Sequence, residues 1–144
     1  MSATVLPVFE NLAVGDTVIE RTVAFSRDTL VRYAGASGDF NPIHYRDDVA
    51  QSVGLPGVLA HGMLTMGVAA SPVSEWIGAA GFVCDYQVRF TRPVPVDASA
   101  GASVSVTATV GALDPELRTA RIDLKVMFGG QTVLGKSQLV VSFT

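Results

Sequence analysis

Apolar and polar residues alternate with a period of two over much of the second half of the chain, which is the pattern of half-buried β-strands. The alternation and the turn residues between its runs predict four strands, at 82–91, 103–110, 119–128 and 131–143. Gly129-Gly130 predicts a two-residue hairpin turn before the last strand. In the first of these strands Cys84 falls on the apolar side, so we expect it to lie in the core.

The first half of the chain has a different pattern. Residues 16–25 suit an opening strand, and Ser26 is a predicted N-cap for a short helix that runs to about Tyr33. A glycine-rich loop follows, and then a second short helix is expected near 46–53. This half therefore predicts one strand followed by a helical block.

The segment from Val49 to Ser74 has no formal charge. Glycine, proline and polar residues interrupt it, and no run of about 18 residues is wholly apolar, so a membrane span is not expected. We expect instead a helix that begins near Val58 and is buried on nearly every side. Pro72 should end or kink this helix near Ser71, because proline removes a helical hydrogen bond.

The order of these elements predicts an α+β fold, with a long buried helix wrapped by an antiparallel β-sheet. The chain has 144 residues and shows no linker, repeat or low-complexity tract. Residues 1–144 are therefore expected to form a single domain.

Composition narrows the classes of function. Charged residues make up 16% of the chain, against roughly 25% in an ordinary soluble protein, and hydrophobic residues make up 49%. This shortage of charge predicts either self-association or a cavity for an apolar ligand. The net charge is −3 with basic residues scattered singly, so no nucleic-acid partner is expected. The single cysteine and an N-terminus without a signal-peptide pattern predict a cytoplasmic protein that does not bind membranes.

The sequence GASGDFNPIHYRDD (35–48) places an acid, Asp39, and an imidazole, His44, five residues apart in a run of turn-forming residues. A hydrophobic core gives no reason for this arrangement. An aspartate in such a run is often only a turn former. The same two groups, folded toward one point by Gly38 and Pro42, are also suited to general acid–base chemistry.

Two longer motifs resemble the MaoC-like dehydratases and (R)-specific enoyl hydratases. They are SGDFNPIH (37–44) and AHGMLTMG (60–67), and the similarity extends to VRFTRPV (88–94). The chain looks most similar to the catalytic subunit of actinobacterial 3-hydroxyacyl-ACP dehydratases of type II fatty-acid synthesis. The resemblance implies a hotdog fold, usually dimeric. It also implies a lyase that interconverts (R)-3-hydroxyacyl and trans-2-enoyl thioesters of CoA or acyl carrier protein.

The resemblance also implies roles for individual residues. Asp39 and His44 would form a dyad that handles the C2 proton and the C3 hydroxyl, with the division between them left open. The backbone N–H of Gly62, near the start of the buried helix, would form the oxyanion hole. Asn41 and His61 would support the loop rather than carry protons.

The family uses no cofactor, and none is expected here. Asp39, His44 and His61 could in principle form a two-histidine, one-carboxylate metal site, which is an alternative. Some related hydratases also place a hydroxyl residue further along the helix to orient the acid. Ala70 fills that position here and Ser71 follows it, so the orientation of Asp39 is open.

Two other functions compete with the lyase. The hotdog fold is shared by thioesterases, and a non-catalytic acyl-binding subunit of a heterodimer would have the same fold. The intact SGDFNPIH motif favours hydration and dehydration over both. As a partner we expect a second hotdog subunit, which would give either a homodimer or a heterodimer.

Overall fold

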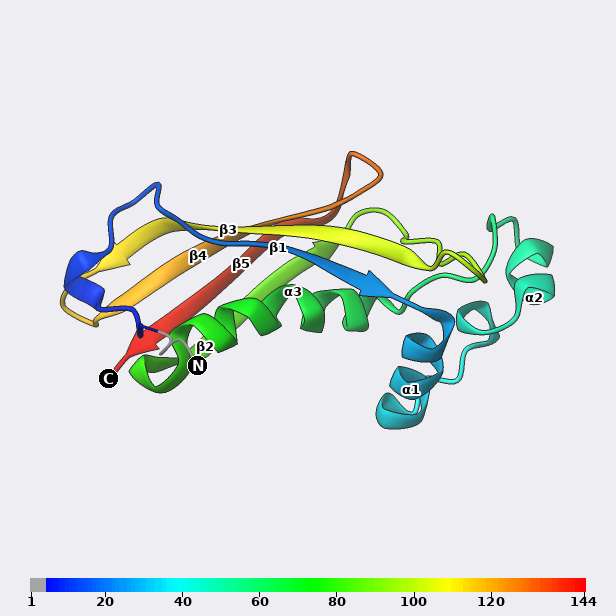
Figure 1. The fold of residues 1–144 in the computed structure, drawn as a ribbon, viewed down its shortest axis with the longest axis horizontal. Helices are drawn as coiled ribbons and strands as arrows, with labels where there is room; N and C mark the ends of the chain where they lie inside the picture. Colours follow the sequence, from blue (N-terminus) through cyan, green and yellow to red (C-terminus); the bar gives the residue numbers. More distant parts are fainter. Residues whose placement is uncertain (1–4) are drawn as a thin grey trace.

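The computed structural model describes residues 5–144, which form one antiparallel sheet and one long helix (Figure 1). The elements in chain order are η1 (Phe9–Asn11), β1 (Thr17–Phe25), α1 (Arg27–Ser37), η2 (Pro42–His44), α2 (Asp47–Ser52), α3 (Gly62–Ile77), η3 (Gly78–Ala80), β2 (Gly81–Phe90), β3 (Ala102–Asp114), β4 (Thr119–Phe128) and β5 (Gln131–Phe143). The strand order across the sheet is β1-β3-β4-β5-β2, and every neighbouring pair is antiparallel. The predicted helix and sheet are therefore present in the expected chain order.

The two strands that flank the helical block, β1 and β2, lie at opposite edges of the sheet. Helix α3 runs along one face of the sheet, and α1, η2 and α2 lie beyond the end where α3 begins (Figure 1). The start of α3 therefore lies beside the loop that follows α1. This arrangement brings the two motifs of the sequence to one place.

The core lies between α3 and the sheet, and the central strands keep their predicted alternation. Every second residue of β3 and β4 is buried against the helix side: Ala102, Val104, Val106, Ala108, Val110, Ala120, Ile122, Leu124 and Val126. β-Branched residues dominate this set, which suits a half-buried pleated surface.

Strand β2 departs from its predicted alternation. Its pairing with β5 shifts by one residue between Val83 and Asp85, so that Cys84 is the extra residue of a β-bulge. The bulge reverses the sides of the strand only before it: Val83 packs against the core and Cys84 is exposed, whereas Tyr86 and Val88, after the bulge, face the core as predicted. The prediction that Cys84 lies in the core is therefore wrong.

Helix α3 also differs from prediction, because it continues through Pro72 to Ile77. Pro72 is itself buried, so packing of the last helical turn against the sheet outweighs the lost backbone hydrogen bond. The opposite face of α3 is open to solvent, with exposed residues at Met63, Gly67, Ser71 and Ser74. The predicted end near Ser71 is wrong, and so is burial on nearly every side within this one chain.

Helix α1 begins where predicted but runs to Ser37, beyond the predicted end near Tyr33. Ser26 caps α1 as predicted and shares a reciprocal capping box with Thr29. Gly38, at a φ of 76°, ends the helix in the left-handed conformation that glycine adopts without strain. Among residues 5–144, no helix is both long enough and apolar enough to cross a membrane.

Candidate active site

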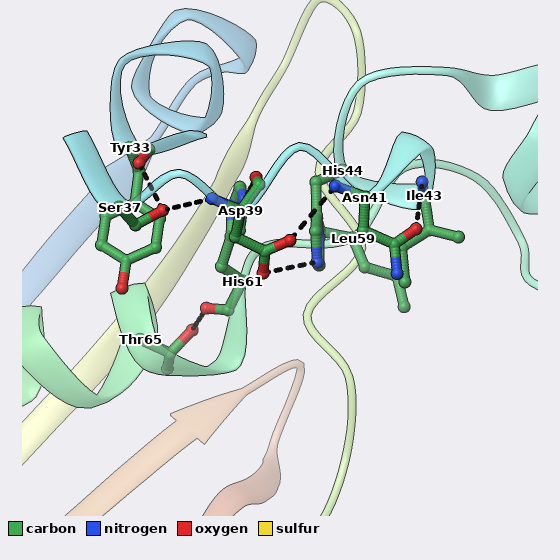
Figure 2. A network of polar contacts seen from close by, with 9 residues as sticks. All are labelled: Tyr33, Ser37, Asp39, Asn41, Ile43, His44, Leu59, His61 and Thr65. Carbon is green, nitrogen blue, oxygen red and sulfur yellow. Dashed lines mark hydrogen bonds and ion pairs between the residues drawn. The ribbon is translucent and has the colours of Figure 1, made fainter. Parts of the chain in front are cut away.

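A chain of local hydrogen bonds shapes the loop between α1 and η2 (Figure 2). The backbone N–H of Asp39 donates to Ser37 Oγ at 3.2 Å, and Asp39 Oδ1 accepts from the Asn41 N–H at 3.1 Å. Asn41 Oδ1 in turn accepts from the Ile43 N–H at 3.2 Å and caps η2. Each bond spans two residues, so the loop geometry is encoded within the motif itself.

The His44 ring is fixed by a contact from the far side of the loop. Its Nδ1 lies 2.7 Å from the carbonyl oxygen of Leu59, which can only accept, so Nδ1 carries the proton. In the neutral ring Nε2 then keeps a free lone pair, 3.9 Å from Asp39 Oδ2. The Asp39 side chain is half exposed, at 51%, and the His44 side chain is only 11% exposed. The Asp39 carboxylate and the His44 imidazole therefore face one another close to solvent (Figure 2).

His61 lies behind this pair, at the N-cap of α3, and is only 1% exposed. Its Nε2 donates to the Asp39 carbonyl at 3.1 Å, which fixes the tautomer. Its ring stacks on His44, with 3.8 Å between centroids and 21° between planes, and meets Tyr33 edge-on at 4.8 Å. Burial lowers the pKa of the His61 imidazole below its usual range, so this ring is neutral at physiological pH.

Gly62 is the first residue of α3, and helix geometry exposes its backbone N–H. The first helical hydrogen bond runs from the Thr65 N–H to the His61 carbonyl at 3.1 Å. The N–H groups of Gly62, Met63 and Leu64 therefore have no acceptor within the helix. The end of a helix also bears a partial positive charge, which favours an oxyanion at this point.

A cavity of about 320 Å³ opens at this helix end. His44 and Gly62 line it together with Phe90 and Arg92, and its inner wall includes the buried side chain of Leu134. The volume lies at the small end of the ligand pockets of about 300–1,000 Å³ found in proteins. The cavity therefore extends from the apolar interior to the N-terminus of α3 and the His44 imidazole.

The hydroxyl groups of α3 do not orient the acid. Ser71 Oγ donates to the Gly67 carbonyl at 3.0 Å, and Thr65 Oγ1 donates to the His61 carbonyl at 3.4 Å. Asp39 is oriented instead by the Asn41 N–H at its carboxylate and by the backbone bonds of its own loop. Although Ala70 stands where some related hydratases have a hydroxyl residue, Asp39 is still oriented by contacts within its own loop.

The metal alternative involves the same three side chains. One ligand atom each from Asp39, His44 and His61 lies within 4.8 Å of the others. One nitrogen of each ring is engaged with a backbone carbonyl, an arrangement that metal-binding histidines also use. The metal site therefore stays an alternative, which elemental analysis of the purified protein tests.

Comparison with known proteins identifies the family. Residues 9–123 match the family described as "MaoC like domain". The chain belongs to this family. It is 33% identical over 133 residues to a 3-hydroxybutyryl-CoA dehydratase of Methylorubrum extorquens, covering 92% of this chain and 82% of that protein. It is 27% identical over 140 residues to an (R)-specific enoyl-CoA hydratase of Rhodospirillum rubrum, covering 95% and 93%.

Solved structures agree with the fold. A MaoC-like dehydratase superposes with a TM-score of 0.89 at 38% identity, over 96% of this chain and 43% of that one. An assembly described as a 3R-hydroxyacyl-ACP dehydratase complex from Mycobacterium tuberculosis superposes at 0.69 and 14% identity, over 91% and 97%, which supports the fold alone. The resemblance read from the motifs and the expected hotdog fold are therefore confirmed.

The structure brings the predicted residues together at one end of α3. Asp39, His44 and Gly62 meet at or beside the cavity, and Asn41 and His61 hold the loop. Sequence analysis did not identify the cavity residues Phe90 and Arg92. Both residues lie in the VRFTRPV motif. A phenylalanine or an arginine in a strand does not by itself indicate a ligand-binding role, so only the cavity beside them reveals one.

Proposed function

We propose that the protein catalyses the reversible dehydration of (R)-3-hydroxyacyl thioesters to trans-2-enoyl thioesters, with Asp39 and His44 as its catalytic dyad. The family and the relatives named dehydratase and hydratase support a hydro-lyase of this class. The observation that carries the proposal is the separation of 3.9 Å between Asp39 Oδ2 and His44 Nε2, beside a cavity that Gly62 also lines.

The mechanism begins at the thioester carbonyl. Removing the weakly acidic C2 proton places negative charge on the carbonyl oxygen. The Gly62 N–H at the helix N-terminus is positioned to donate a hydrogen bond to that oxygen. Such a preorganised donor is worth about 10²–10³-fold in rate.

The dyad then completes the elimination. One member of the Asp39–His44 pair takes the C2 proton, and a proton delivered by the pair lets the C3 hydroxyl leave as water. The protons balance over the cycle, so neither an external acid nor a base is consumed. In the hydration direction the same groups activate water and protonate C2.

Asn41 and His61 are positioning residues in this proposal. Asn41 closes the turn on which His44 lies, and His61 holds the Asp39 backbone while packing against the His44 ring. A neutral, buried His61 has no route to solvent, so it is unsuited to proton transfer in each catalytic cycle.

We also propose that a second hotdog subunit covers the exposed face of α3 and the free edge of β2. The α3 face is made of small residues and methionine, and β2 exposes Phe82 at 57% and Phe90 at 54%. An edge strand with exposed aromatic residues is expected to be covered in the assembled protein. Light scattering coupled to size exclusion tests this, and a stable, active monomer contradicts it.

The decisive experiment is hydration of crotonyl-CoA, followed by loss of the conjugated enoyl absorbance, for the wild type, Asp39→Asn and His44→Ala. Activity in the wild type that falls at least 100-fold in both variants supports the lyase and its dyad. A thiol reagent in a parallel assay detects CoA release, which would indicate a thioesterase. Activity unchanged in both variants contradicts the mechanism.

A further inference from the structure

The orientation of the His44 imidazole depends on one backbone carbonyl, that of Leu59, which accepts from Nδ1 at 2.7 Å (Figure 2). Because this bond keeps the proton on Nδ1, it also decides that Nε2 presents a lone pair toward Asp39. Leu59 lies between Val58 and Ala60, in a segment outside every helix and strand. The contacts that hold residues 58–60 in place therefore also control His44.

Residues 58–60 are held by both backbone and side-chain hydrogen bonds. Three backbone bonds join them to residues of other segments: Ile43, Val94 and Val96. Among residues 5–144, only two side chains bond to their backbone. One is His44, and the other is Asp47, whose Oδ1 accepts from the Val58 N–H at 3.0 Å. Asp47 is therefore the side chain, other than the catalytic imidazole itself, that fixes this segment.

An arginine from α1 holds the Asp47 carboxylate in turn. Nη1 and Nη2 of Arg27 donate to its two oxygens at 3.1 and 2.9 Å, and Nε donates to the Val96 carbonyl at 2.6 Å. This paired geometry aims the carboxylate more strictly than a single hydrogen bond would. The Arg27 hydrogen bonds and the Val58 N–H lower the pKa of the Asp47 carboxyl below its usual range, so it stays ionised and accepts both.

The neighbouring acid, Asp48, has a different environment. It also lies in the first turn of α2 and also pairs with an arginine, Arg46. Within the part of the chain that the structure describes, however, no hydrogen bond joins it to residues 58–60. Acidic residues are common at helix N-termini, which is sufficient to explain Asp48. Asp47 differs because it bonds to the segment that orients the imidazole.

We propose that Asp47, held by Arg27, is a positioning residue for His44: by fixing Val58 it fixes the Leu59 carbonyl that sets the tautomer of the imidazole. Neither Asp47 nor Arg27 lines the catalytic cavity. Both line a separate cavity of about 470 Å³ that shares no lining residue with it, so they act through His44 and not on the substrate. The kinetic consequence rests on the proposed function, whereas the effect on the His44 ring does not depend on any reaction.

The test measures crotonyl-CoA hydration and the His44 tautomer in Asp47→Ala, Asp47→Asn and Arg27→Met. The chain has two histidines, and the structure gives them opposite tautomers, with the proton on Nδ1 in His44 and on Nε2 in His61. Proton–nitrogen correlation NMR spectra of the imidazole rings therefore distinguish them, and the His44→Ala spectrum provides the assignment. Asp48→Ala is the matched control, because it removes an acid and an ion pair from the same helical turn.

In Asp47→Ala we expect kcat to fall about 10–100-fold with KM within about twofold, because misplacing a catalytic group by about 1 Å can cost about 10²-fold in rate. The His44 ring should become a mixture of tautomers, since Nδ1 loses its fixed acceptor. Asp47→Asn keeps an oxygen for the Val58 N–H and should recover most of both properties. Arg27→Met should lose about threefold, since a partly exposed ion pair contributes less. Asp48→Ala should match the wild type.

An unchanged His44 tautomer in Asp47→Ala would overturn the inference, whether or not kcat falls, since Asp47 would then act by another route or not at all. An equal loss in Asp48→Ala would also overturn it, because any acid at this helix end would then suffice. If Asp47→Ala does not fold, the tautomer and kcat of Arg27→Met decide, and no change in either contradicts the proposal. Failure of the proposed function looks different: the wild type would hydrate no thioester, while the tautomer would still respond to Asp47→Ala.

Discussion

The loop from Ser37 to His44 and the start of α3 meet at one cavity, but different forces hold them in place. The loop is half exposed and is fixed by hydrogen bonds that each span two residues. His61, the N-cap of α3, is buried and is fixed by ring stacking and packing. We therefore expect that substitutions in the loop can change activity without changing the stability of the fold. Substitutions at the start of α3 should change both together.

The largest effect is expected from Asp39, where two substitutions separate its roles. Asp39→Asn keeps an oxygen that can accept from the Asn41 N–H, so the turn should survive while proton transfer is lost. We expect kcat to fall about 10²–10⁴-fold with an unchanged melting temperature. Asp39→Ala should lose as much activity and also about 1 kcal/mol of stability, because the Asn41 N–H loses its partner.

Enoyl hydration and thermal unfolding, measured on the same preparations, check this pair of variants. Equal melting temperatures for Asp39→Asn and Asp39→Ala would show that the carboxylate does not hold the turn. The Asn41→Ala variant serves as a control, because it leaves the Asp39 and His44 side chains in place but removes the acceptor for the Ile43 N–H.

His61→Ala should show the coupled behaviour of the helix end. The substitution empties a buried site and leaves the Asp39 carbonyl without its donor, so we expect a loss of about 1–3 kcal/mol in the free energy of unfolding. Activity should fall with it, because Asp39 and the His44 ring both lose support. His61→Gln can restore the donor and should recover part of the stability, whereas an activity loss without a stability change would contradict the positioning role.

The pH dependence of stability tests whether His61 is neutral in the folded protein. Its pKa is lowered by burial, whereas in the unfolded chain it is near the usual value of about 6.5. The unfolded state therefore binds more protons below that pH, and stability should fall as the pH drops from about 6.5 toward 5. His61→Gln lacks this group, so its melting temperature should fall less over the same range.

Asp39 and His44 lie beside position 61 in both proteins, so the comparison isolates the effect of the His61 imidazole. Parallel melting curves for wild type and His61→Gln between pH 6.5 and 5 would show that His61 takes up a proton equally in both states. That result would refute the neutral ring on which its positioning role depends.

The same division explains what the sequence could predict. The N-cap at Ser26 and the Asp39–His44 loop depend on neighbours within a few residues, and both were predicted, whereas the end of α1 at Gly38 was missed by about four residues. The stacking of His61 on His44 was not predicted, because it depends on how α3 packs. The family resemblance indicated that both belong to one site, but not how they touch.

Strand β2 and helix α3 show the limit most clearly. A strict alternation placed Cys84 in the core, but one extra residue in the pairing with β5 reversed the sides of the strand at Val83 and Cys84. Proline usually ends a helix, but burial of Pro72 and Ile77 against the sheet continued α3 beyond it. In both places a tertiary contact outweighed a local rule, which no pattern within one segment reveals.

The smallest effect is expected at Cys84, and it tests the β2 bulge directly. Because the thiol is exposed, Cys84→Ser should change the free energy of unfolding by no more than about 0.5 kcal/mol and leave hydration activity intact. Val83→Ser, one residue away, should cost more, because Val83 packs against the core. If the sequence alternation were right after all, the two costs would be reversed, with the serine at position 84 destabilising the protein and the one at position 83 tolerated. Urea denaturation of the two variants therefore decides which face of β2 is turned inward, and with it which of its side chains a second subunit can reach.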